Sequence, residues 1–187
     1  MQRLSFVLSA LTLAACASTP KAVTRDARHP MVPSLRLESG GPTVVFDAID
    51  GWRLVPGTAT SRLIMAREGR KDETARVLIV EAAPGQPIEE ITGQWTRAAA
   101  ALDDPHIIGI SPPAYLSDHE SSFVIQSLTD DKEPMVMTCH ITLVSNNVWD
   151  FWAVIAVNGP VADAPALSAT VDRIAKSLRV EPSLSPK

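Results

Sequence analysis

The chain has 187 residues, of which 45% are hydrophobic, and its formal net charge at pH 7 is −4. This length suits one globular domain with a sizeable core. The mild acidity gives no reason to expect a nucleic-acid partner, because such partners are held by clustered basic residues.

The first 15 residues have the features of a secretory signal. Arg3 supplies a positive charge, and the apolar run that follows, residues 4–13, is shorter than the roughly 20 residues that a membrane-spanning helix needs. The run ends in Leu13-Ala14-Ala15-Cys16, which resembles the bacterial lipobox. That resemblance implies cleavage before Cys16 and attachment of lipid to its thiol. An ordinary secretory signal with a chance cysteine is the alternative.

The lipobox leads us to expect a cell-envelope protein that is held to a membrane by covalent lipid on Cys16, because two or more acyl chains give stable anchoring. In such lipoproteins an Asp after the cysteine often means retention at the inner membrane. Ala17 stands there instead, which favours the periplasmic face of the outer membrane. If Cys16 carries lipid, the second cysteine, Cys139, is left alone and no disulfide within the chain is possible.

The chain divides into four segments. Residues 16–40 mix Pro, Ser, Arg and Ala without a period, so we predict the lipidated cysteine followed by a flexible tether with a reach of roughly 25–30 Å. A single globular domain should occupy residues 41–181, and residues 182–187 should form a frayed tail.

The first half of the domain reads as four strands and a helix. Alternating or continuous apolar runs bounded by turn residues predict the strands. They cover residues 42–47, 51–56, 62–67 and 76–81. After Pro87, apolar residues recur three and four positions apart, from Ile88 to Leu102, as on one face of a helix.

The second half reads as a loop, three strands and a closing helix. Residues 106–120, with Pro112-Pro113, are predicted to be a loop. Strands are predicted over residues 121–128, 134–144 and 148–157. We expect Asp163 to cap the closing helix with its side chain. Its core-facing residues should be Leu167, Val171, Ile174, Ala175 and Leu178.

This order predicts an α+β fold, in which helices pack on an antiparallel sheet of about six to seven strands. It resembles the PsbP-like fold, a superfamily that includes photosystem II subunits, a Ran-binding import factor and small bacterial lipoproteins. The residues that carry the resemblance are Gly51-Trp52-Arg53, the helix after Pro87, the hairpin at Asn146-Asn147 and the closing segment, residues 171–180. The superfamily shares no single activity and many members bind other proteins, so the resemblance implies a fold and leaves the function open.

Cys139 is expected to be structural. On a strand it points the same way as Met135, Met137 and Ile141, which marks a core face, and a buried cysteine behaves as a small hydrophobe. The neighbouring His140 should point to the opposite face, which disfavours a Cys–His catalytic pair.

A metal site is weighed and not predicted. Imidazoles and carboxylates gather around one predicted loop, but no two of the histidines have the spacing of metal ligands. The residues are His106, Asp103, Asp104, Asp118, His119 and Glu120.

Trp149 and Trp152 are candidate interaction residues. They have opposite strand parity, so one of them should lie under a helix and the other on a partly exposed face. Aromatic residues are enriched at binding hot spots. The alternative is that helices cover both sheet faces and both indoles are core.

The chain contains no GxSxG, P-loop, HExxH or Gly-rich dinucleotide motif, and we assign no catalytic residue and no cofactor. The leading hypothesis is a non-catalytic cell-envelope lipoprotein that binds a protein partner or supports an assembly. The alternative is a small-ligand carrier or a hydrolase with a pocket between sheet and helices.

Overall fold

The structure is a computed structural model, which describes residues 33–36, 42–55, 61–70, 72–102, 104–146 and 148–181. The predicted signal, the predicted lipid-attachment residue Cys16, most of the predicted tether and the predicted tail lie outside the described residues. Within these ranges, neither helix is long and apolar enough to cross a bilayer.

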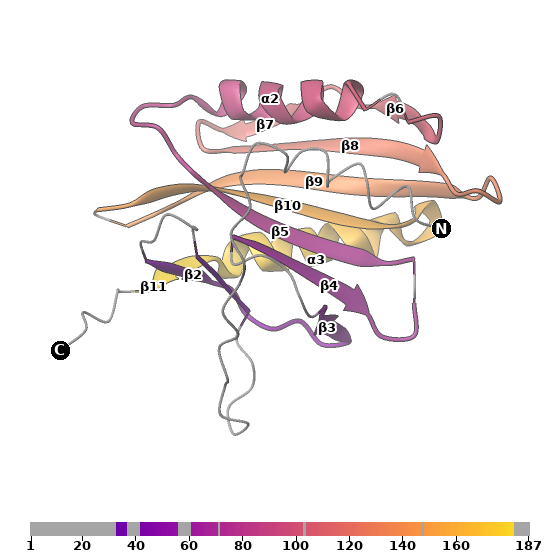
Figure 1. The fold of residues 1–187 in the computed structure, drawn as a ribbon, viewed down its shortest axis with the longest axis horizontal. Coiled ribbons are helices and arrows are strands. Elements are labelled where there is room, and N and C mark those ends of the chain that lie inside the picture. Colours follow the sequence, from indigo (N-terminus) through magenta and orange to yellow (C-terminus); the bar gives the residue numbers. More distant parts are fainter. Residues whose placement is uncertain are drawn as a thin grey trace, which may run out of the picture.

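The larger of two sheets has eight strands in the described part of the chain, in the order β3-β4-β5-β10-β9-β8-β6, with β7 paired to β8 (Figure 1). Every pairing is antiparallel. The strands are β3 (Trp52–Leu54), β4 (Arg62–Arg67), β5 (Thr74–Glu81), β6 (Ile107–Ile110), β7 (Ala114–Ser117), β8 (Glu120–Leu128), β9 (Pro134–Ser145) and β10 (Asp150–Pro160).

A second sheet has three short strands, β1 (Ser34–Arg36), β2 (Thr43–Val45) and β11 (Arg179–Glu181), in the order β1-β2-β11. Two sequence predictions are corrected here. Strand β1 lies within the predicted tether, because Leu35 is buried at 1% exposure and pairs with Val44. Leu178, predicted to lie on the core-facing side of the closing helix, instead follows the last helical residue, Ser177, and β11 begins at Arg179.

The helices are α2 (Ile88–Ala100) and α3 (Ala164–Ser177), and a short 3-10 helix, η1 (Val161–Asp163), leads into α3. The side chain of Asp163 makes no capping hydrogen bond, contrary to our prediction. It pairs instead with Arg70, whose Nη1 lies 3.3 Å from Asp163 Oδ2. This contact joins the start of α3 to the turn between β4 and β5.

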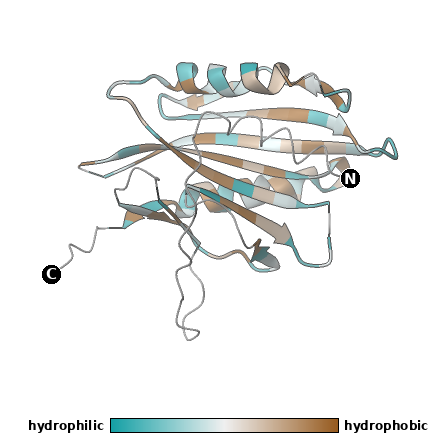
Figure 2. Cartoon of the chain, in the orientation of Figure 1, coloured by the Kyte–Doolittle hydropathy of each residue, from teal (hydrophilic) through white to brown (hydrophobic). Residues whose placement is uncertain are grey.

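The strands β9 and β10 separate two apolar cores, and hydrophobic residues gather along the central strands (Figure 2). Along β9, Met137, Cys139 and Ile141 point toward the core that contains α2 residues. Val136 and Val144 point toward the core that contains residues of α3 and of the smaller sheet. The strand alternation predicted for β9 is therefore confirmed.

Residues 106–120 are not a loop, as the sequence suggested, but carry β6 and β7. Both pair with the same edge of β8, and Pro112-Pro113 separates them. All four residues of β7 are exposed, so no apolar alternation marks it as a strand. Pairing with β8 determines its conformation.

The stripe that holds α3 on the sheet gives a testable prediction. Ile174 is fully buried, while Ala169 is exposed on the same helix. Ile174→Asp should lower the free energy of unfolding by about 4–5 kcal/mol, because it loses apolar burial and places an unpaired charge in the core. Ala169→Asp adds the same charge on the outer face of α3 and should change the free energy of unfolding by less than about 0.5 kcal/mol. Urea denaturation measures both, and equal effects would contradict this packing.

Candidate functional site

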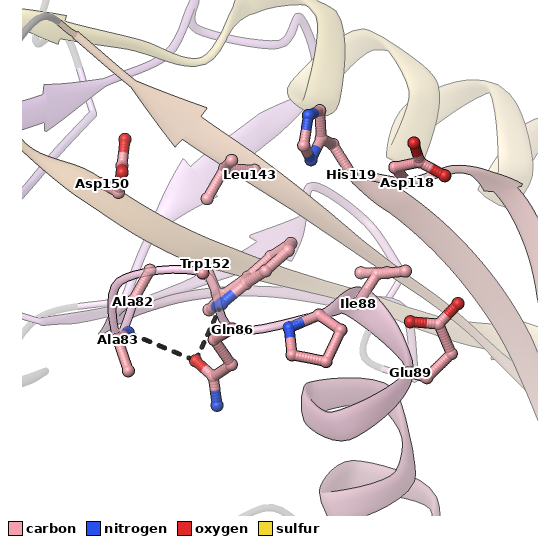
Figure 3. A pocket seen from close by; sticks show the side chains of 12 residues that line it. Ala82, Ala83, Gln86, Ile88, Glu89, Asp118, His119, Leu143, Asp150 and Trp152 are labelled. Carbon is pink, nitrogen blue, oxygen red and sulfur yellow. Dashed lines mark hydrogen bonds between the residues drawn. The ribbon is translucent and has the colours of Figure 1, made fainter.

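A pocket of about 470 Å³ opens where the start of α2 meets the sheet (Figure 3). Five segments contribute to it: the β5–α2 loop, the first turn of α2, the β7–β8 turn, β9 and β10. The lining residues are Ala82, Ala83, Gly85, Gln86, Pro87, Ile88, Glu89, Asp118, His119, Leu143, Asp150 and Trp152.

The indole of Trp152 forms a fixed wall of this pocket. Trp152 is buried at 1% exposure, and its Nε1 donates a hydrogen bond of 3.0 Å to Gln86 Oε1. The backbone N–H of Ala83 donates to the same oxygen over 3.4 Å (Figure 3). Gln86 Nε2 in turn donates to Glu90 Oε1 over 3.3 Å. Gln86 therefore ties the loop, the helix and the indole together.

The charged groups of the pocket are acidic. Glu89, Asp118 and Asp150 carry exposed carboxyl groups there, His119 lies beside them, and neither Lys nor Arg lines the pocket. A carboxylate rim beside apolar lining residues suits a cationic group attached to an apolar body, through charge attraction and apolar contact.

The residues considered for a metal site separate into two places. His106 lies near Asp104 and Asp130, with its Nε2 3.2 Å from Asp130 Oδ1, and the backbone N–H of Leu128 donates to its carbonyl oxygen. His119 precedes the other end of β8, about 27 Å away along an extended strand. Asp103 lies outside the described residues. Among the described residues, no three His, Cys, Asp or Glu side chains are arranged to hold a metal ion.

Cys139 and His140 point to opposite faces of β9, as predicted. Cys139 lies in the core beside α2, and burial raises the pKa of its thiol to about 12, so it is protonated at neutral pH. His140 lies on the α3 side, where burial lowers its pKa more than the charges of Glu120 and Asp172 raise it. Neither geometry nor charge makes this pair a catalytic one.

Trp149 and Trp152 are separated as their parity indicated. Trp152 belongs to the core, so it presents no aromatic surface of its own. Trp149 is 39% exposed at the tip of the β9–β10 hairpin, where its ring stacks on the buried Phe151 with 6.4 Å between ring centroids. Val148, beside it, is 78% exposed.

The backbone of this hairpin tip is held by Asn146. Its Oδ1 accepts hydrogen bonds from the N–H groups of Val148 and Trp149, over 2.9 and 2.8 Å. Its own N–H donates to the carbonyl oxygen of Trp149 over 3.0 Å. The tip therefore presents two apolar side chains to solvent on a fixed frame.

The β4–β5 turn contains a buried acid that was not predicted from the sequence. Glu73 is 1% exposed, and its Oε2 accepts from Arg67 Nη1 over 2.6 Å. Its Oε1 has no hydrogen-bond partner but lies 3.7 Å from Arg70 Nη1. With Asp163 this makes an ion-pair network that joins the turn to α3, which is a structural role. The segment "REGRKDE" consists of charged residues around one glycine, so its sequence gives no signal of a buried acid.

No protein-family model matches the chain, and no curated protein matches it significantly. Its fold is shared with solved structures. The Ran-binding protein Mog1p of Saccharomyces cerevisiae is 11% identical, with a TM-score of 0.53 over 80% of this chain and 95% of that one. A point mutant of the protein Mog1 is 9% identical, with a TM-score of 0.55 over 82% of this chain and 98% of that one.

A third similar structure is LpqN, described as involved in cell envelope biogenesis of Mycobacterium tuberculosis. It is 11% identical, with a TM-score of 0.50 over 81% of this chain and 91% of that one. These identities are low, so the likeness concerns the fold. It confirms the predicted α+β architecture of the PsbP-like type.

His140 gives a prediction about pH. Its pKa in the folded protein lies below the unfolded value, so the unfolded state binds more protons as the pH falls. The stability that neutral His140 contributes is present above pH 6.5 and is lost as the pH falls through the folded pKa. Acidification from neutral pH should therefore destabilise the wild type, and His140→Gln should lose less stability, as measured by urea denaturation. The exposed control His119→Gln should behave as wild type. If the free energy of unfolding of His140→Gln fell with pH as steeply as that of the wild type, the burial argument would be contradicted.

Proposed function

We propose that this protein is a cell-envelope lipoprotein, anchored by lipid on Cys16 at the periplasmic face of the outer membrane, that binds a protein partner without catalysing a reaction. Three observations support the proposal. The N-terminal sequence at residues 13–16 resembles a lipobox, the fold is similar to that of a Ran-binding protein and of a protein involved in cell envelope biogenesis, and the β9–β10 tip exposes apolar side chains.

The hairpin tip is the single observation that carries the binding role. Exposed apolar groups on a flexible loop would lose conformational entropy on binding, but Asn146 and Phe151 already hold Trp149 in place. Rigid aromatic residues of this kind are typical anchors of protein interfaces. We propose that Trp149 and Val148 enter an apolar pocket of the partner.

A protein partner suits the tip better than a lipid surface. Asp150 is exposed beside Trp149, and the chain is acidic overall. Both features oppose approach to anionic headgroups, for which binding segments are usually rich in Lys and Arg. An apolar tip in an acidic setting instead favours a partner whose apolar pocket has a neutral or basic rim.

The anchor is tested by Cys16→Ser. The substitution removes the thiol that would form the thioether with lipid, so incorporation of radiolabelled fatty acid in growing cells should fall to background. The protein should then leave the membrane fraction. The control Cys139→Ser should keep both label and membrane association. Unchanged labelling in Cys16→Ser would contradict the lipoprotein assignment.

The binding surface is tested by placing a photo-crosslinking residue at position 148 in the lipid-anchored protein in intact cells. A discrete crosslinked band should form, and Trp149→Ala on the same chain should reduce its yield at least tenfold, because truncating such an anchor typically removes more than about 2 kcal/mol. The matched control carries the crosslinker at exposed Ala169 on α3 and should give no such band.

Three results would contradict the hairpin-tip proposal: crosslinking to lipid alone, no band from position 148, or a yield that is insensitive to Trp149→Ala. Since Trp149 is partly exposed, its loss should leave thermal unfolding near the wild-type temperature. That measurement separates lost binding from lost folding.

The pocket at the start of α2 favours a second candidate function, a carrier of a small cationic ligand. It lies between the sheet and a helix, and its rim carries three carboxyl groups near the fixed indole of Trp152. Trp149 does not line this pocket. Trp149→Ala would therefore weaken the protein interaction and leave the pocket intact.

A further inference from the structure

Two arginines lie side by side on the face of the large sheet that also carries Trp152. Arg76 of β5 pairs with Ala156 of β10 and with Ile64 of β4, and Arg62 of β4 pairs with Leu78. Directly paired residues point to the same face, so both guanidinium groups rise from that face as diagonal neighbours. Their Cα atoms are therefore about 7–8 Å apart.

Among the residues that the structure describes, neither guanidinium has an acidic partner that would balance its charge. Three of their N–H groups are shielded from solvent and make no hydrogen bond: Nε of Arg62, and Nε and Nη1 of Arg76. No described carboxylate forms a salt bridge with either residue, whereas Arg67, Arg70 and Arg179 all have acidic partners. Burial and the charge of Arg62 together lower the pKa of Arg76.

Unpaired charges of this kind destabilise a folded protein. A buried donor without an acceptor lowers the free energy of unfolding, and repulsion between two neighbouring cations lowers it further. Strongly basic groups with unused donors are suited to a doubly negative oxyanion, since a guanidinium fork matches the oxygens of phosphate. Phosphate carries a charge of about −1.5 to −2 near pH 7, which balances two arginines.

We propose that Arg62 and Arg76 form a binding site for a phosphate group. The neighbouring apolar side chains on this face, Ile64 and Leu78, are partly exposed and would lie beside the non-phosphate part of the ligand. The site does not depend on the hairpin tip or on the α2 pocket. A free phosphate monoester and the monoester headgroup of phosphatidic acid share the recognised chemistry.

Thermal unfolding of the purified protein in inorganic phosphate tests the site, with chloride at equal ionic strength and pH 7 as the reference. Phosphate should raise the midpoint of the wild type in a saturable way, as a ligand of the native state does. Arg76→Met keeps the aliphatic stem and removes the charge. It should weaken apparent phosphate binding at least tenfold, and should melt no lower than wild type in chloride because an unpaired buried cation is gone.

Two further variants keep the test decisive. Arg62→Lys retains the charge but loses the fork, so it should fold as wild type and bind phosphate severalfold more weakly. Arg173→Met, on the exposed face of α3, should keep the wild-type phosphate response. The proposal is overturned if phosphate gives the wild type no shift beyond that of chloride, or if Arg76→Met and Arg62→Lys retain it in full. A structural role for Arg76 would show as a lower midpoint in chloride with the phosphate shift unchanged.

Sedimentation with vesicles distinguishes the two sources of the phosphate group. If the headgroup is the ligand, vesicles that contain phosphatidic acid, whose headgroup is a phosphate monoester, should bind the non-lipidated Cys16→Ser protein more tightly than phosphatidylcholine vesicles, and Arg76→Met should remove the difference. If a free phosphate monoester is the ligand, the thermal shift should occur without vesicle binding that depends on Arg76. Either result requires the same two arginines.

Discussion

Burial of the central hairpin on both faces is the constraint on which the rest of the structure depends. Strands β9 and β10 form the longest antiparallel pairing, and apolar cores lie on both sides of it. A two-stranded hairpin alone is marginal in water, so α2 on one side and α3 with the smaller sheet on the other must cover it. The short strands β1 and β11 help to cover the apolar core on the α3 side, where no disulfide among the described residues stabilises the fold.

Double coverage also restricts where polar groups can lie. Inside the covered region they are paired or held neutral: Thr92 Oγ1 and Ser121 Oγ are 2.6 Å apart, and burial lowers the pKa of His140. The side chains that remain free to bind other molecules lie at the borders of this doubly covered region. Trp149 lies at the tip of the β9–β10 hairpin, the pocket opens at the start of α2, and the two arginines lie on β4 and β5, near the edge strand β3.

Local periodicity predicted the elements that bury a regular stripe of side chains. The helix after Pro87, the closing helix and the β4 boundaries all follow from it, and parity alone separated Trp149 from Trp152. Strand β7 could not be found in this way, because its residues are exposed and only pairing with β8 defines it. The three-residue strands β1 and β11 are too short to show a pattern. The pocket was missed as a particular set of residues because five separate segments line it. The arginine pair requires the register between β4 and β5, which no single strand contains.

The pocket and the arginine pair share one face of the sheet and carry opposite charge. The electrostatic interaction between them determines whether a ligand at one site affects binding at the other. Trp152 and Ala156, which mark the two positions on β10, are four residues or about 13 Å apart along the strand. Two unit charges at that separation in water interact by about 0.3 kcal/mol, and physiological salt, with a Debye length of about 8 Å, reduces this further. Occupation of one site should therefore shift affinity at the other by less than a factor of about two. Such weak coupling makes the two sites independent in function, so that an acidic pocket and a basic pair can coexist on one face without neutralising each other.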